Sequence, residues 1–510
     1  MNSNPRLTRS LHFLPILSSN LSAIWLRDKY PHNYEITAIE AYMDLYQLTG
    51  DAIYINAVDG FWDIFRAHWI HVGGTVAIKE WRLYPPGSYF LDTTGDSGAG
   101  HGVEKNCSWN PAIPDRVCPG PPLSDPKCKG CSHSTGETCG QVFWIKLNQR
   151  LHQYRPLNES YVGEIERTLL NGVISQLPPA TLPNATQYRN GIRQFALLHK
   201  KKMLLDNRST CCEGQATRML GSLPEYLVNT GQRTLSIDMY QHALISLSDV
   251  FDDDEEEVLI ANGSTLLMET KWPRGSSVQL RMQGSSPAAA LGSFAIRVRI
   301  PSWLVTPTAN VTLHTNDSAT TSAASWEVPR GTYLSIPSRV WRDGDTLSFA
   351  LSMQLQGTQY TGLTVVLGHD RYAVQYGPVL LALVSAPWNN ALDTMVIPKS
   401  AIGGKPLIPT SWLMPAGDGN SLHFKLKRPE RAAGGAGAVA TAAKMRWIPY
   451  YEVQEELFEV YPSVPISLAT SSVKPFHATL GAVYTARPGE GSVTSGDLAA
   501  VAPSHDYPKS

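Results

Sequence analysis

The sequence predicts an α+β protein with more than one domain, in which a helical part is followed by a β-sandwich. Up to about residue 231, apolar residues recur at three- and four-residue spacing, which is the period of an amphipathic helix. After Thr230-Gly231 the pattern changes to short β-branched runs of alternating polarity separated by turn residues, which is typical of a sandwich. A chain of 510 residues is long enough for two or three packed domains.

The helical part begins with two helices joined by a short turn. The first covers residues 34–47 and places four apolar residues on one face: Ile36, Ile39, Met43 and Tyr46. Gly50 then stops this helix, and Asp51 caps a second one that carries Tyr54, Ala57, Phe61 and Phe65 on one side. Further helices are expected at residues 139–151, 160–176 and 212–228. Helical hairpins of this kind stack into α/α toroids and solenoids.

The β part is expected to contain strands at residues 259–262, 277–282, 294–300, 309–314, 333–336, 346–353, 372–381 and 458–467. The small-residue tract within residues 400–445 indicates a loop or linker. These patterns predict four parts. They are a helical domain over 1–231 with an insert at 96–133, a β-sandwich over 232–385, a linker with a further β segment over 386–486, and a disordered tail over 487–510.

The charge balance excludes two classes of partner. The 43 Lys and Arg residues face 44 Asp and Glu residues, so no excess of positive charge points to nucleic acid or to an anionic membrane surface. No apolar run approaches the roughly 20 residues that cross a bilayer. Eight Asn-x-Ser/Thr sequons favour a secreted protein, whereas the first 21 residues form no clear signal peptide and favour a cytoplasmic one.

Three cysteines occupy positions that suit a metal or a nucleophile. Cys211 and Cys212 lie where an extended segment meets a helix, and Glu137 and Cys139 begin another helix. One carboxylate and three thiolates would complete a four-coordinate zinc set, although buried cysteines at helix starts are also common as small apolar packers. A thiol redox function is disfavoured because no Cys-x-x-Cys lies at a βα junction.

Several short strings resemble, in the same order along the chain, the β-L-arabinofuranosidase-type glycoside hydrolases of glycoside hydrolase family 127 and its relatives. The strings are Leu48-Thr49-Gly50-Asp51, Phe61-Trp62-Asp63, His71-Val72-Gly73-Gly74, Gly136-Glu137-Thr138-Cys139, Cys211-Cys212 with Arg218, Arg297-Val298-Arg299-Ile300-Pro301-Ser302-Trp303-Leu304, Trp341 with Gly344-Asp345, and Tyr376-Gly377-Pro378. The resemblance covers residues 30–385. It implies an (α/α)₆ barrel followed by β-sandwich domains and a carbohydrate substrate carrying L-arabinofuranose.

The resemblance also implies the site residues. Zinc would be held by Glu137, Cys139, Cys211 and Cys212, and Cys211 would be the nucleophile of a retaining mechanism. The general acid/base glutamate follows a Gly-Gly turn in the family, which favours Glu80 and leaves Glu104 as the alternative. His32 stands where the family has a sugar-contacting histidine, although a lone histidine is more often structural.

The chain departs from the family at its front, because family members begin much earlier and those residues form part of the barrel. The sequence therefore predicts an incomplete barrel. It also leaves open a second function, that of a catalytically impaired homologue that still binds zinc or carbohydrate.

Overall fold

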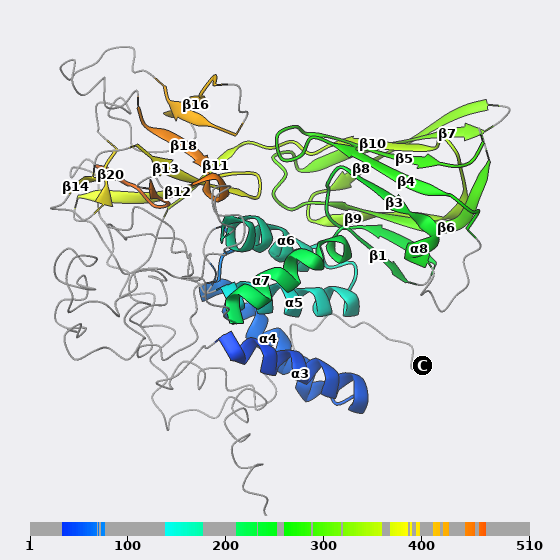
Figure 1. Ribbon diagram of the computed structural model, residues 1–510, viewed down its shortest axis with the longest axis horizontal. Coiled ribbons are helices and arrows are strands. Elements are labelled where there is room, and N and C mark those ends of the chain that lie inside the picture. The colour runs from blue at the N-terminus through cyan, green and yellow to red at the C-terminus, as the bar shows by residue number, and fades with distance from the viewer. Residues whose placement is uncertain are drawn as a thin grey trace, which may run out of the picture. The chain divides into compact units, whose positions relative to one another are not determined.

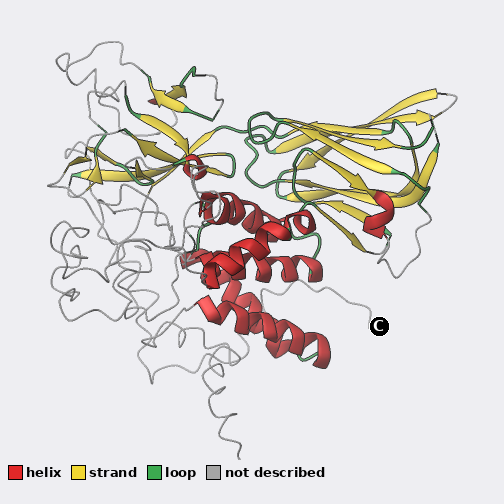
Figure 2. Ribbon diagram, viewed as in Figure 1, coloured by secondary structure: helices red, strands yellow, loops and turns green. Residues whose placement is uncertain are grey.

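The computed structural model describes residues 33–68, 70, 73–76, 138–176, 211–231, 233–251, 260–286, 289–317, 320–359, 368–385, 388–389, 394–397, 412–418, 422–427, 444–453 and 458–465. Helices come first along the chain and strands follow (Figures 1 and 2). All of these residues belong to one compact unit, Met1–Ile466. Among them, no helix has both the length and the apolar character that a bilayer span requires. The predicted insert and tail lie outside the described residues.

The predicted hairpin at the start of the helical part is confirmed. Helix α3 (Asn33–Thr49) and helix α4 (Ala52–His68) pack against each other, and Gly50 between them has a positive φ of 69°. The Asp51 carboxylate accepts a hydrogen bond of 3.0 Å from the Ile53 backbone N–H, which makes it the helix cap expected from the sequence. The apolar faces of both helices enter one buried cluster with α5 (Thr138–Tyr154).

Two of the predicted helices have different ends from those expected. The segment predicted as one helix over 160–176 is α6 (Glu159–Thr168), followed by one π turn, η4 (Leu169–Val173), and one 3₁₀ turn, η5 (Ile174–Gln176). The helix predicted over 212–228 ends much earlier, because α7 covers Cys211–Gly221 and a 3₁₀ turn, η6 (Leu223–Tyr226), follows. Gly221 lowers helix propensity and Pro224 lacks the N–H that would continue the ladder.

The strands that follow form two sheets around one core. The first sheet joins β1 (Val228–Gly231), β2 (Thr234–Ile237), β6 (Ala290–Ile300) and β9 (Thr332–Arg342) in that order. The second joins β3 (Ala243–Ser246), β4 (Thr265–Thr270), β5 (Ser277–Gln283), β10 (Thr346–Ala350), β7 (Thr308–Asp317) and β8 (Thr320–Pro329). Helix α8 (Leu247–Phe251) follows β3. Inward side chains of both sheets belong to one hydrophobic cluster, the expected arrangement of a sandwich.

One predicted strand of this region is misplaced. Residues 260–262, the described part of the strand expected at 259–262, form no strand, and β4 begins only at Thr265. Asn262 and Gly263 form a turn there, with Gly263 at a φ of 73°. The turn chemistry of this pair outweighs the short apolar run that precedes it.

A third sheet crosses the boundary that the sequence placed at residue 385. It joins β11 (Leu355–Gln359), β12 (His369–Tyr376), β13 (Val379–Val384), β18 (Arg446–Pro449), β17 (Phe424–Leu426) and β16 (Leu413–Pro415), while β19 (Phe458–Glu459) and β20 (Ser463–Pro465) pair with β13 and β12. A short hairpin, β14 (Trp388–Asn389) and β15 (Thr394–Met395), and a 3₁₀ turn, η8 (Tyr450–Glu452), complete this part. Strands before and after residue 385 are therefore direct neighbours.

Two more expectations are corrected by the third sheet. The strand predicted over 372–381 is the hairpin of β12 and β13, because Gly377 has a φ of 57° and Pro378 cannot donate to the ladder. The predicted linker at 400–445 supplies β16 and β17, whose Leu413, Phe424 and Leu426 are buried in the core. The single strand expected over 458–467 is in fact two short ones, β19 and β20.

The coarse fold class is therefore confirmed, with helices first and a β-rich part after them. Closure of the helices into an (α/α)₆ barrel remains a prediction. The segments 77–137 and 177–210, which connect these helices along the chain, are outside the described residues.

Candidate functional site

The predicted site residues are described to different extents. The side chain of Cys139 is described, whereas Cys211 and Cys212 are described only as the first backbone positions of α7. His32, Glu80, Glu104 and Glu137 lie outside the described residues. The convergence of the four zinc ligands, and the roles of Glu80 and His32, therefore remain predictions.

Cys139 lies in the first turn of α5, and its side chain is only 2% exposed. It belongs to the apolar cluster that α3, α4 and α5 share. Phe143 and Trp144 of the same helix are members of this cluster too. A buried thiol in this position suits both a metal ligand and an apolar packer, the two alternatives that the sequence left open.

Helices α5 and α7 run in the same direction along each other. Met219 of α7 shares a buried cluster with Val142 of α5, and Glu225, just after α7, lies 3.7 Å from Lys146 and 3.3 Å from Gln149. Residue numbers therefore rise together along the two helices. Their first turns, one with Cys139 and the other with Cys211-Cys212, are at the same end of the pair.

Hydrogen bonds join residues 73–76 to the first turns of α5 and to the end of α6. The Gln141 side chain forms two hydrogen bonds with the backbone of Val76, at 2.7 and 2.8 Å. The Thr168 hydroxyl donates to the Gly74 carbonyl at 2.6 Å, and the Asn171 amide donates to the Gly73 carbonyl at 2.7 Å. Val76 and Cys139 belong to the same buried cluster, so the chain leaves Val76 from the apolar region that contains this thiol.

We expect Gly74→Ala to lower the free energy of unfolding by about 2–4 kcal/mol, from backbone strain and overpacking together. Gly74 has a φ of 81°, and a Cβ there would lie 2.8 Å from Cδ of Arg167 and closer still to its Cγ. Chemical denaturation would measure the change. Gly50→Ala is the matched control, because Gly50 has a φ of 69° but no atom within 4 Å of the added Cβ. Equal losses in the two variants would show that Arg167 makes no difference.

A set of buried charges joins the helices to the first sheet, and we call Glu159, Glu166, Arg299, Asp238 and His152 the polar junction. The fully buried Arg299 guanidinium donates to Glu159 at 2.6 and 2.9 Å and to Glu166 at 3.1 Å. Burial alone would lower the pKa of Arg299, but the carboxylates of Glu166 and Glu159 raise it above its ordinary value. The guanidinium therefore stays charged.

Asp238 is the second centre of the polar junction. Its carboxylate lies 3.1 Å from Nε2 of His152 and accepts hydrogen bonds from Asn229 and, at 2.9 Å, from the Tyr333 hydroxyl. Its backbone carbonyl accepts a hydrogen bond of 3.2 Å from Arg299. Burial, followed by the charge of Asp238, raises the pKa of Tyr333 well above its ordinary value, so this hydroxyl remains a donor.

The polar junction accounts for one of the strings that carry the family resemblance. In Arg297–Leu304, Arg299 holds two carboxylates of α6, and the Trp303 indole N–H donates to Glu166 at 2.7 Å. Sequence reasoning did not single out Glu159, Glu166, Asp238 or His152. The available signal was Arg299 itself, because an arginine inside a core strand needs buried acidic partners.

A second string is explained by Asn171, which lies in the π turn after α6. Its amide donates to the Gly73 carbonyl and, at 2.9 Å, to the Pro378 carbonyl, and its oxygen accepts a 3.0 Å bond from the Leu380 N–H. The Asn171 side chain thus forms hydrogen bonds with both the Gly73-Gly74 turn and the Tyr376-Gly377-Pro378 turn and links them to the helices. Both turns serve packing in the described structure.

Glu40 on α3 is a titratable residue that the sequence analysis did not consider. Burial raises its pKa to about 7, although Arg150, Arg218 and Lys146 oppose this shift. Lys146 and Arg150 lie seven and eleven positions after Cys139, or about 10 and 16 Å along the helix. Glu40 therefore faces the middle of α5 rather than its first turn, and we assign it no catalytic function.

Within the part of the chain that the structure describes, no group of three or more His, Cys, Asp or Glu side chains could hold a metal ion. This does not test the expected zinc set, since only Cys139 among its four side chains is described. The described features that fit such a set are the burial of Cys139 and the common direction of α5 and α7.

Comparison with known proteins identifies the family. The model described as the GH127 catalytic domain of β-L-arabinofuranosidase matches residues 27–225, and that of the GH127 middle domain matches residues 255–353. No curated protein matches the chain significantly.

Solved structures resemble the fold at low sequence identity. A GH127 β-L-arabinofuranosidase from Geobacillus stearothermophilus T6 has a TM-score of 0.50 and 16% identity, over 87% of this chain and 62% of that one. A protein described only as a glycoside hydrolase has a TM-score of 0.53 and 18% identity, over 86% and 68%. A GH127 β-arabinofuranosidase has a TM-score of 0.51 and 18% identity, over 88% and 62%.

The chain spans about three fifths of the length of the Geobacillus enzyme. The likeness to these structures shows a shared fold. The two matched models, which both represent one family, together cover more than half of the chain. The chain therefore belongs to the GH127 family, the family of the β-L-arabinofuranosidase catalytic and middle domains.

Proposed function

We propose that this protein is a retaining glycoside hydrolase that releases terminal L-arabinofuranose from carbohydrate. The observation that carries the proposal is the match of residues 27–225 to the GH127 catalytic domain, a segment that includes all four expected zinc ligands and Glu80. The low-identity structures add support for the fold only. We further propose that the helices belong to an (α/α)₆ barrel.

The proposed catalytic site takes Glu137, Cys139, Cys211 and Cys212 as ligands of one Zn²⁺. Zinc prefers four ligands of this kind and, when bound, keeps a thiol ionised at neutral pH and lowers its basicity. The buried Cys139 thiol and the shared direction of α5 and α7 support this set. His32 is proposed to contact the sugar.

The proposed reaction has two displacements at the anomeric carbon. In the first, the Cys211 sulfur forms a bond to C1 while the glycosidic C–O bond breaks and the leaving oxygen takes a proton from the acid/base glutamate. In the second, the same glutamate removes a proton from water, whose oxygen attacks C1 and releases the Cys211 thiolate. Two inversions retain the configuration of the sugar.

Glu80 is the favoured acid/base residue, and Glu104 is the alternative. Val76 is held by two hydrogen bonds to Gln141, beside the first turn of α5. Four further residues lead to Glu80, and an extended chain of that length reaches about 14 Å at most. The chain can therefore bring Glu80 to the region of Cys139, which supports this choice.

Zinc analysis and an activity assay together test the proposed function. Purified protein should contain about one zinc per chain and hydrolyse a chromogenic β-L-arabinofuranoside. Cys139→Ser should lose the zinc and the activity, whereas Cys128→Ser, which changes a cysteine of the insert, should keep both. Retention of zinc by Cys139→Ser would contradict the ligand set. Stable zinc without turnover would instead favour a non-catalytic binding protein.

A further inference from the structure

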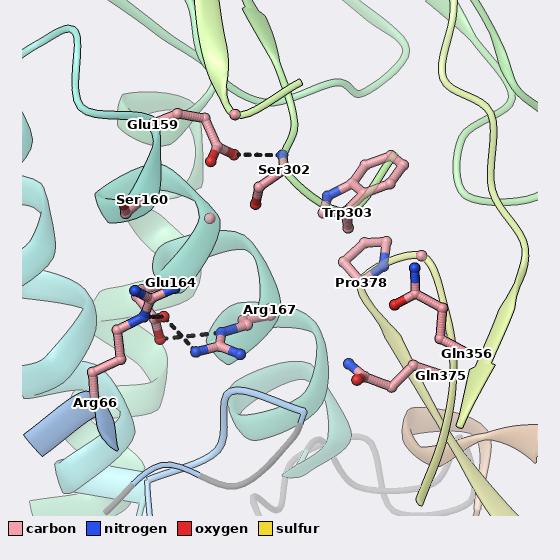
Figure 3. A pocket seen from close by; sticks show the side chains of 13 residues that line it. Arg66, Glu159, Ser160, Glu164, Arg167, Ser302, Trp303, Gln356, Gln375 and Pro378 are labelled. Atoms are coloured by element: carbon pink, nitrogen blue, oxygen red, sulfur yellow. Dashed lines mark hydrogen bonds and ion pairs between the residues drawn. The ribbon is translucent and has the colours of Figure 1, made fainter. Parts of the chain in front are cut away.

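A cavity of about 310 Å³ lies beside the polar junction and is not accounted for by the proposed catalytic site. This volume is at the lower end of the roughly 300–1,000 Å³ typical of small-molecule sites. Its walls come from α4 and α6, from the Ser302-Trp303 turn after β6, and from β11 and β12 (Figure 3). None of its lining residues is a proposed zinc ligand or acid/base residue.

One wall of the cavity is aromatic and held in place. The half-buried Trp303 borders it (Figure 3). The indole N–H of Trp303 donates to Glu166 at 2.7 Å. Glu166 is itself bound by the buried Arg299. Because its polar atom is already paired inside the protein, the Trp303 ring offers the cavity an apolar surface, which suits the C–H face of a sugar ring.

The wall opposite the helices carries two glutamine amides. Gln356 of β11 and Gln375 of β12 are directly paired in the register of these strands, and both are half-buried (Figure 3). Neither amide has a hydrogen-bond partner among the residues that the structure describes. Each amide can donate and accept hydrogen bonds. The two glutamines therefore suit a ligand whose groups also donate and accept hydrogen bonds, such as hydroxyl groups.

The charges around the cavity cancel. Arg66 and Arg167 both bind the buried Glu164, Arg66 at 2.8 Å, so these two guanidinium groups share one carboxylate. On the other side, Glu159 and Glu166 share Arg299. The lining itself therefore holds two arginines, Arg66 and Arg167, and two glutamates, Glu159 and Glu164, and this balance favours a neutral ligand over an anion.

We propose that this cavity is a non-catalytic subsite for a neutral oligosaccharide that contains L-arabinofuranose. Trp303 stacks on one sugar ring, while Gln356 and Gln375 form hydrogen bonds with its hydroxyl groups. The identity of the sugar rests on the proposed function, whereas the class of ligand rests on the aromatic wall, the two amides and the balanced charge.

Hydrogen–deuterium exchange with the full chain tests this proposal by location. The probe is a thio-linked β-L-arabinofuranosyl disaccharide, which resists hydrolysis. It should protect backbone amides in residues 300–304, 355–359 and 371–377, and the double change Gln356→Ala with Gln375→Ala should raise the half-maximal concentration about tenfold or more. Gln279→Ala is the matched control, since Gln279 is an exposed glutamine on β5, and should leave this concentration unchanged.

The outcomes separate this proposal from the proposed function. Protection at the cavity without hydrolysis of the chromogenic substrate would support the subsite and contradict the proposed hydrolase activity. Hydrolysis without protection at the cavity would overturn the subsite alone. Equal protection in the double variant would also overturn it. So would protection by inorganic phosphate in place of the disaccharide, because that would identify an anion site around Arg66 and Arg167.

Discussion

Arg299→Met is expected to lower the free energy of unfolding by about 3–5 kcal/mol, which is the cost of leaving buried carboxylates without their partner. Arg299 is fully buried and binds Glu159 and Glu166, which are 3% and 1% exposed. Methionine keeps much of the volume but none of the five donors. Urea unfolding followed by circular dichroism would measure the loss.

Arg297→Met is the matched control for this prediction. Arg297 lies two residues earlier on β6, on the same face of the strand, and is only half-buried. The control should change stability by less than about 1 kcal/mol, because partly exposed charges contribute little. Adding Glu159→Gln to Arg299→Met should recover part of the loss. A loss in Arg299→Met no larger than in the control would show that the polar junction does not hold the helices to the first sheet.

Cys211→Ala is expected to lower kcat/KM on a β-L-arabinofuranoside by at least about 10³-fold, as removal of a catalytic nucleophile does in other hydrolases. The reason is that no other group is proposed to form the covalent bond to C1. Gly214→Ala provides the control on the same helix. Gly214 has no atom within 4 Å of an added Cβ, so this variant should remain as active as the parent.

A labelling experiment supports the same assignment independently of rate. An arabinose-derived electrophile, followed by peptide mass mapping, should modify Cys211. Labelling of another residue, or activity that survives Cys211→Ala, would contradict the nucleophile proposed here. Loss of activity in Gly214→Ala as well would point to a damaged helix rather than to lost chemistry.

Local signals predicted the elements whose causes are local. The α3–α4 hairpin followed from apolar periodicity, Gly50 and Asp51, and all of these act within a few residues. The early end of α7 is an exception: its causes, Gly221 and Pro224, are local, but the prediction followed the apolar spacing beyond them and was wrong. The strands β16 and β17 were missed because three-residue strands carry too little alternation to detect, and they are stable only through pairing with each other and with β18.

The candidate site, too, could be predicted from the sequence only where its signals lie in neighbouring residues. The resemblance identified the cysteines and Glu137, which are close in the chain to recognisable strings. It did not reveal the polar junction, because the partners of Arg299 are 133 and 140 positions earlier in the chain. It also did not reveal the cavity beside Trp303, whose walls come from separate helices and strands.

The amino-acid sequence by itself determined the family, the order of helices before strands, and the residue types available for zinc and nucleophilic chemistry. These features depend on short motifs and on the periodic spacing of apolar residues, and both can be recognised from residues that are close together in the chain. Only the tertiary structure decided which strands pair across residue 385, which acids neutralise Arg299, and which amides line a cavity with Trp303. These pairings depend on the desolvation of polar groups and on contacts between distant segments. A buried charge and its partner come together only when the chain has folded around them.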